Sequence, residues 1–193
     1  MLRPAEIEDA SLAKAMMQEA MFGDPPVFDA ALGAQNRPIS KDGLVVFQQG
    51  RNGREAALIS LRESGDIYIQ VPAENQGRQF GFSAIIEEDI TAKLAASMNY
   101  AAWLLGRIDP TEKVSHVAVA ARLSGGSFYG WRTRAEQAAS PNSGSVSMSG
   151  NDAQRHAPVM LTPGHRVRQA LTMNAPHLVE DLVALLRRQW KDS

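Results

Sequence analysis

The sequence predicts an α+β fold, with a mostly antiparallel sheet of four to five strands packed by a long central helix and a C-terminal helix, plus an N-terminal helix. Three observations support this prediction. Short segments rich in β-branched and aromatic residues follow one another closely between residues 44 and 71, separated by turn sequences. Two longer amphipathic patterns, at 83–109 and 174–190, are typical of helices. The regular alternation of strand and helix found in doubly wound parallel sheets is missing.

Residues 1–42 are expected to form a helix and a connector. Apolar side chains at Leu12, Met16 and Ala20 recur among polar ones at a spacing that places them on one helical face. The segment Gly23–Pro26 ends this pattern, because proline lacks a backbone donor and disfavours helix in the residue before it. The connector should run to about residue 42.

Three strands should follow as an antiparallel meander. The candidate segments are Leu44–Gln49, Ala56–Arg62 and Ile67–Val71. Glycine-containing turn sequences separate them at 50–53 and 63–66, which indicates two consecutive hairpins.

The strongest helical pattern lies between a candidate cap at Ser83 and the stop at Asp109. Its acidic triplet Glu87–Asp89 falls in the opening turns, where negative charge offsets the helix dipole. The last helix should begin after a cap at Asn174 and should tolerate Pro176 in its first turn. Both helices carry a continuous apolar stripe and should pack on the sheet.

The region between these helices is less regular. Val114–Leu123 alternates apolar and small residues and predicts a fourth strand, and Val159–Leu161 is either a fifth short strand or a buried loop. A long Gly/Ser-rich loop is expected over residues 124–158, with local order only around Trp131–Ala139. A short helical piece should follow and end near Met173.

Length and composition favour one domain over residues 1–193, since a chain of this size can bury roughly 70% of its unfolded surface. There is no cysteine, which excludes disulfides and thiolate metal sites and fits a cytoplasmic location. The start of the chain is acidic, and no apolar run approaches the roughly 20 residues that cross a bilayer. Neither a secretory signal nor a membrane association is expected.

Familiar catalytic and cofactor motifs are missing. The sequence has no phosphate-binding glycine motif and no nucleophile elbow. Its four histidines are scattered without the spacing of metal ligands. We therefore expect no cofactor and no metal, and an enzymatic role is the less favoured interpretation.

Charge is distributed unevenly along the chain. Residues 113–168 hold seven Lys or Arg against two Asp or Glu, whereas residues 1–112 hold ten against sixteen. Glycines and three aromatic residues surround the arginines near position 130, a combination that suits anionic groups and flat rings. The candidate ligand-binding residues are Arg122, Tyr129, Trp131, Arg132, Arg134, His165, Arg166 and Arg168.

Two points about this segment stay open in the sequence. In the alternative interpretation, the arginines pair with acidic residues from 1–112 while Phe128 and Trp131 anchor the loop to the core, because uneven charge within one chain often neutralises itself on folding. The second basic piece, His165–Arg168, is expected in the first turns of a helix, where free backbone N–H groups attract anions. Whether it lies near Arg132 and Arg134 depends on the fold.

The leading hypothesis is a non-enzymatic interaction or regulatory domain. Its basic, aromatic-containing face at 113–168 would bind an acidic protein partner or an anionic ligand, and the chain would self-associate as a homodimer. One alternative is a nucleic-acid-associated accessory domain that uses the same residues, with aromatic rings stacking on bases. Another is an enzyme acting on a small anionic substrate, with His165 as acid or base.

Overall fold

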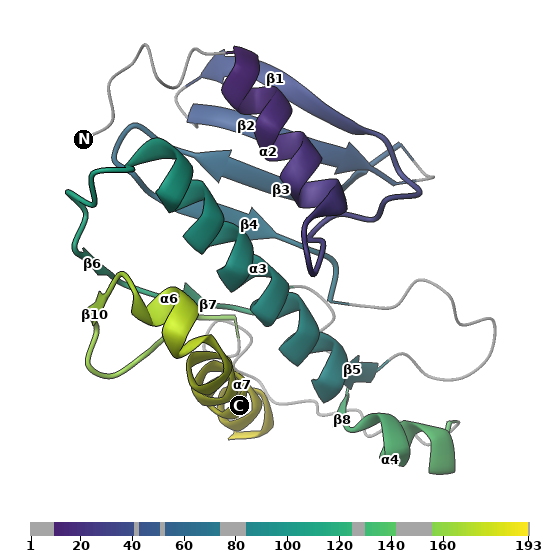
Figure 1. Ribbon diagram of the computed structural model, residues 1–193. Helices are drawn as coiled ribbons and strands as arrows, with labels where there is room; N and C mark the ends of the chain where they lie inside the picture. Colours follow the sequence, from purple (N-terminus) through teal and green to yellow (C-terminus); the bar gives the residue numbers. More distant parts are fainter. Residues whose placement is uncertain are drawn as a thin grey trace. The chain divides into compact units, whose positions relative to one another are not determined.

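The computed structural model describes residues 10–40, 43–50, 53–73, 84–124, 130–141 and 156–192. The chain folds into two compact units (Figure 1). Unit 1 is Met1–Pro72 with Ala96–Lys113, and unit 2 is Ala73–Ala95 with Val114–Ser193. The helix α3, Glu87–Ile108, begins in unit 2 and ends in unit 1. The mixed α+β class is confirmed, and the division into units is a feature that the sequence pattern does not show.

Unit 1 is built on a four-stranded antiparallel sheet. Its strands lie in the order β1-β2-β3-β4, so each strand pairs with its neighbour in sequence. The strands are β1 Ala34–Ser40, β2 Gly43–Gln49, β3 Glu55–Leu61 and β4 Ile67–Gln70. The last three fall where the sequence predicts them, and the antiparallel meander is confirmed.

β1 is a strand where the sequence predicts a connector. The segment Ala34–Ser40 is polar and contains Pro38, and neither feature is typical of a strand. It pairs with β2, with Arg37 opposite Val45, and forms an edge of the sheet, the position at which a proline is tolerated. The Arg37 guanidinium lies 4.7 Å from the centre of the Phe47 ring on β2. The partner strand, rather than local propensity, makes this segment extended.

The first residue of β2 must be a glycine. Gly43 has a φ of 79°, in the left-handed region that other residues rarely adopt. A Cβ at this position would lie 2.1 Å from the carbonyl oxygen of Leu61, far inside van der Waals contact. Gly43 therefore lets β2 begin directly beside the end of β3.

Two helices pack on one face of this sheet: α2, Ala10–Phe22, and the C-terminal half of α3 (Figure 1). The first helix and the long central helix are thus confirmed. The buried cluster joins them to β2 and β3, and its members are Leu12, Ala13, Met16, Ala20, Phe28, Leu44, Val46, Ala57, Ile59, Leu61, Tyr100 and Leu104. The Tyr100 hydroxyl donates to the Met16 carbonyl at 3.2 Å. Burial, with a smaller effect of Glu19, raises the pKa of Tyr100 far above its ordinary value.

A buried glutamine holds the connector that precedes β1. Gln48 is 1% exposed. Its amide nitrogen donates to the carbonyls of Asp29 and Leu32, each at 2.8 Å, and its amide oxygen accepts from the Asp29 backbone N–H at 2.9 Å. One side chain in the sheet therefore fixes the backbone of a segment without regular structure.

Unit 2 is organised around α7, Ala175–Asp192, which begins after Asn174 and carries Pro176 in its first turn, as predicted. The buried stripe of α7 consists of Leu178, Val179, Leu182, Val183, Leu186 and Trp190. Its other elements are β5 Ala84–Ile86, β6 His116–Val117, β7 Ala120–Ala121, β8 Gly130–Arg132, α4 Arg134–Ala139, β9 Val159–Met160, β10 Arg166–Val167 and α6 Ala170–Met173. β5 and β8 pair in parallel, and the other two pairs, β6 with β10 and β7 with β9, are antiparallel.

The predicted fourth and fifth strands do not extend the four-stranded sheet. They pair with each other in unit 2, where α7 contacts β7, β8 and β9. The local order expected around Trp131–Ala139 is confirmed as β8 and α4. Residues 125–129 and 142–155 of the predicted Gly/Ser-rich loop lie outside the described residues.

The prediction that His165–Arg168 lies in the first turns of a helix is wrong. Arg166 and Val167 form strand β10, and α6 begins only at Ala170. Val167 is β-branched and pairs with His116, and the Arg168 backbone N–H donates to the Ser115 carbonyl at 2.9 Å. A pairing with a distant strand decides the conformation here, so the argument for anion binding at a helix N-terminus does not apply.

Candidate functional site

Residues 114–123 and 158–168 run antiparallel and together form one two-stranded ribbon in unit 2. β7 pairs with β9 at one end, and β6 pairs with β10 at the other. Between them, the Leu161 backbone N–H donates to the Val119 carbonyl at 3.4 Å. The segment 162–165 forms a loop, which Arg166 braces by donating from Nη2 to the Thr162 carbonyl at 2.8 Å.

Exposure alternates along the first strand of the ribbon, because successive side chains of a strand point to opposite faces. From His116 to Leu123, residues at odd positions are buried or half-buried, and residues at even positions are exposed. The inner residues are Val117, Val119, Ala121 and Leu123, and the outer ones are His116, Ala118, Ala120 and Arg122. α7 contacts β7 and β9, and α6 contacts β10, so the helices lie against the inner face.

The end of the ribbon is fixed to α7. His156 lies with its ring edge toward the ring of Trp190, at 5.8 Å between centroids, and its Nδ1 is 2.9 Å from the Leu123 carbonyl oxygen. The Gln189 side chain donates to the Ala157 carbonyl at 2.7 Å. These contacts give His156 a structural role and hold the two strands in register.

The outer face of the ribbon exposes two large apolar side chains and an arginine. Met160 is 53% exposed and Val167 is 52% exposed. They lie opposite Ala120 and His116, whose side chains point outward, and Arg122 is exposed on the same face. Neither strand of the ribbon contains an aspartate or a glutamate.

The predicted basic residues of the ribbon therefore differ in their surroundings. Arg122 and His165 are exposed, and no described side chain pairs with either. Arg166 is half-buried, and its Nε is enclosed without a hydrogen-bond partner among the described atoms. Arg168 is 8% exposed and lies on the inner side. Tyr129 lies outside the described residues.

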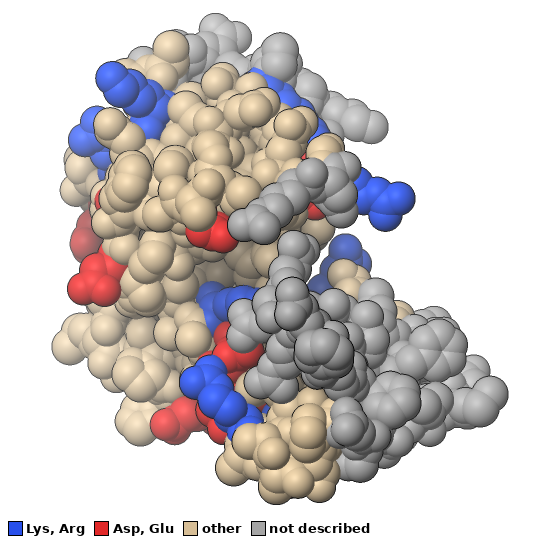
Figure 2. All heavy atoms as spheres, turned by 90° about the vertical axis from the view of Figure 1, so that its right-hand side faces the viewer, with Lys and Arg blue, Asp and Glu red and all other residues tan. Residues whose placement is uncertain are grey.

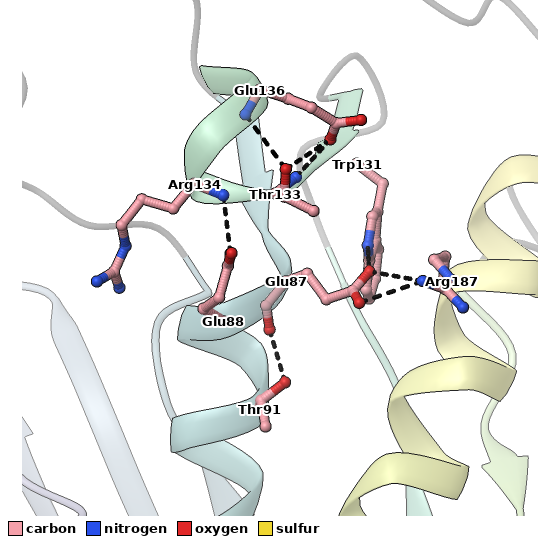
Figure 3. A network of polar contacts seen from close by, with 8 residues as sticks. All are labelled: Glu87, Glu88, Thr91, Trp131, Thr133, Arg134, Glu136 and Arg187. Atoms are coloured by element: carbon pink, nitrogen blue, oxygen red, sulfur yellow. Dashed lines mark hydrogen bonds and ion pairs between the residues drawn. The ribbon is translucent and has the colours of Figure 1, made fainter. Parts of the chain in front are cut away.

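The other predicted residues belong to a separate polar network at the start of α3 (Figure 3). Trp131 is buried, and its indole Nε1 donates to Glu87 Oε2 at 2.7 Å. Arg187 of α7 donates from Nη1 to both oxygens of the same carboxylate, at 3.2 and 3.1 Å. Glu87 thus clasps β8 and α7 together, and its side chain is 24% exposed.

The neighbouring arginines are also engaged. Arg134 donates from its backbone N–H to Glu88 at 2.8 Å and from Nη2 to Asp89 at 2.6 Å. Arg132 donates to the Gln137 side chain at 3.1 Å and to the Ser140 carbonyl at 2.8 Å. Arg134 therefore pairs with acidic residues from 1–112, as the alternative interpretation expects.

The acidic triplet Glu87–Asp89 lies in the first turn of α3, as predicted, and it also neutralises part of the basic segment. On the face shown in Figure 2, cationic side chains lie directly beside acidic ones. The described part of that face does not present an unbroken positive surface.

The short helix α4 is fixed by a capping box. The Thr133 hydroxyl accepts from the Glu136 backbone N–H at 3.2 Å, and the Glu136 carboxylate accepts from the Thr133 backbone N–H at 2.7 Å. The bond from the Thr133 backbone, followed by the bond from its hydroxyl, holds the pKa of Glu136 below its ordinary value. This cap fixes the start of α4 at Arg134, directly after β8.

Met160 and Val167 are functional candidates that the sequence pattern does not identify. Met160 lies in the middle of the apolar run Val159–Leu161, and a run of three cannot tell which residue faces outward. Val167 lies between two arginines in a segment that the pattern assigned to a helix. Only the pairing with 116–121 shows that both side chains share the outer face.

The described residues hold no group of three or more His, Cys, Asp or Glu side chains suited to a metal ion. Among those same residues, none of the helices is both long and apolar enough to cross a bilayer. Comparisons with protein-family models, with curated proteins and with solved structures found no match to this chain.

Proposed function

We propose that this protein is a non-enzymatic interaction or regulatory domain that binds an acidic partner through the ribbon of unit 2. The observation that carries the proposal is the outer face of the ribbon, where Arg122 is exposed without a described partner on strands that contain no carboxylate. The positive charge of Arg122 attracts acidic groups, and the ribbon strands contain no Asp or Glu that would repel them.

Contacts within the protein favour the ribbon over the predicted residues Trp131, Arg132 and Arg134 as the binding surface. Arg134 is already paired with Asp89, and Trp131 donates to Glu87. An acidic partner would have to displace these contacts before it gained new ones. At Arg122 it displaces no contact with a described residue.

The same contacts favour a protein over a nucleic acid as the partner. Single-stranded nucleic acids are held by exposed aromatic rings that stack on bases. Trp131 is 8% exposed and is committed to Glu87, so it offers no free ring face. On the outer face of the ribbon, the exposed large side chains are aliphatic rather than aromatic.

The proposal is tested by fluorescence anisotropy with a fluorescein-labelled decaglutamate peptide as the probe. We expect binding that weakens as ionic strength rises from 50 to 300 mM, because a partly exposed charge contact is screened over about 8–10 Å. Arg122→Ala should lower the affinity about two- to fivefold, the usual effect of one exposed ion pair.

Arg188→Ala is the matched control, because Arg188 is an exposed arginine of the same unit that belongs to α7 and not to the ribbon strands. It should leave the affinity for decaglutamate within error of the parent protein. Equal losses in the two variants would show that the peptide senses only net charge. Tighter binding of a labelled single-stranded decanucleotide than of decaglutamate would refute an acidic protein as the partner.

A further inference from the structure

We infer that the partner of the ribbon is an acidic peptide segment that carries apolar side chains, which pack on Met160 and Val167 while its carboxylates face Arg122. This inference rests on the proposed function and specifies the chemistry of the partner. It predicts a mixed contact, in which charge selects the segment and apolar packing contributes most of the affinity.

The register of the ribbon places the three side chains in a row. Val167 lies opposite His116, and Met160 lies opposite Ala120, four residues farther along the same strand. At about 3.3 Å per residue, the two apolar side chains are about 13 Å apart along the ribbon, and Arg122 lies about 7 Å beyond Met160. All three are on the outer face, since even spacing on a strand keeps side chains on one side.

On the first strand, the outward residues between the two apolar side chains add little polarity. Ala118 and Ala120 are the outward residues of the first strand there, and both are exposed. The side chains of Met160 and Val167 are each about half exposed, at 53% and 52%. Single exposed apolar residues are ordinary on protein surfaces. On the first strand only Ala118 lies between their partners His116 and Ala120, and on the second strand the loop 162–165 separates Met160 from Val167. We call the outer face that carries these two side chains, Ala118 and Ala120 the apolar strip.

Charge complementarity is the argument for what covers this strip. Of the three arginines in the ribbon strands, Arg122 is exposed on the outer face, whereas Arg166 lies opposite the inner residue Val117 and Arg168 is buried. Neither strand carries a carboxylate. A basic or neutral apolar peptide would gain the packing but would lose the favourable potential around it. An acidic segment with apolar residues gains both the apolar packing and the electrostatic attraction, so it is the occupant that we infer.

The test uses two labelled peptides of 16 residues and equal negative charge. One has glutamates with two leucines four positions apart, a spacing that matches the strip in an extended chain, and the other has serines in place of the leucines. We expect the leucine peptide to bind about tenfold more tightly, as two half-buried leucine side chains would provide.

Met160→Gln combined with Val167→Thr should remove this difference while leaving the affinity for the serine peptide unchanged. Both substitutions keep the side-chain shape close to the original at exposed positions, so the fold should persist, which circular dichroism checks. Met173→Gln is the matched control, because Met173 is 79% exposed in the same unit but belongs to α6. It should preserve the tenfold preference.

The outcomes separate this inference from the proposed function. If both peptides bind equally, the apolar contact is refuted and acidic binding stands. If neither peptide binds, the proposed function fails and this inference fails with it. If sedimentation velocity shows a dimer that Met160→Gln with Val167→Thr converts to monomer, a second copy of the chain covers the strip, and the acidic peptide is refuted as its occupant.

Discussion

The contacts of Glu87 with Trp131 and Arg187, which we call the Glu87 clasp, offer the sharpest test of how unit 2 is held together. Trp131→Phe keeps an aromatic ring at a buried position and removes the indole N–H that donates to Glu87 at 2.7 Å. Glu87→Ala removes the acceptor and the ion pair with Arg187. A double-mutant cycle of these two changes isolates the hydrogen bond, since the lost ring volume and the lost helix-terminal charge cancel in it.

The magnitude follows from the nature of the bond. A hydrogen bond to a charged acceptor contributes about 1.5–3 kcal/mol when buried. The Glu87 side chain is 24% exposed and shares its charge with Arg187, so water and the second donor weaken the contact. We therefore expect a coupling free energy of about 1–2 kcal/mol between Trp131 and Glu87.

Urea unfolding monitored by far-ultraviolet circular dichroism measures the four free energies of unfolding, with a constant m value as the check that the compared states are alike. A control cycle pairs Trp131→Phe with Arg188→Ala, an exposed arginine next in sequence to Arg187, and should be additive within about 0.5 kcal/mol. A coupling between Trp131 and Glu87 that is equally small would refute the clasp as a stabilising contact.

Three further predictions concern single residues. Gln48→Leu should lower the free energy of unfolding by about 2–4 kcal/mol in urea titrations, because it leaves three backbone groups of the connector without their partner. Gly43→Ala should cost about 2 kcal/mol or more, since its Cβ would meet backbone at a positive φ, whereas Gly33→Ala, with open space around it, should change stability by less than about 1 kcal/mol. The lowered pKa of Glu136 means that its carboxylate stabilises α4 at pH above its unfolded pKa, an effect lost as pH falls through the folded pKa. NMR titration should therefore give Glu136 a lower midpoint in the parent protein than in Thr133→Ala, which keeps only the backbone bond, and equal midpoints would contradict a role for the hydroxyl.

Much of the fold follows from local sequence. The three hairpin strands, α3 and α7 lie within a few residues of their predicted positions, because alternation and helical periodicity report directly which face of an element is buried. The start of α7 at Ala175 follows from the Asn174-Ala175-Pro176 sequence in the same way. These features depend on neighbours close in the chain.

β1 and β10 could not be predicted in this way. β1 is polar and contains Pro38, and it is extended because β2 supplies its backbone partners. β10 follows a turn sequence that suits a helix start, and its pairing with His116–Val117 overrides that signal. In both segments the deciding hydrogen bonds join residues that lie outside the segment itself, so no local pattern contains them.

For the candidate site, too, the sequence determined one part and the tertiary structure the other. The sequence by itself determined that positive charge gathers in residues 113–168, because residue type fixes formal charge. The tertiary structure alone decided which of those charges meet acidic partners: Arg134 reaches Asp89 across 45 positions, whereas Arg122 stays exposed on the outer face of the ribbon. Electrostatic energy depends on distance in space and on burial, and both are properties of the folded chain rather than of its composition.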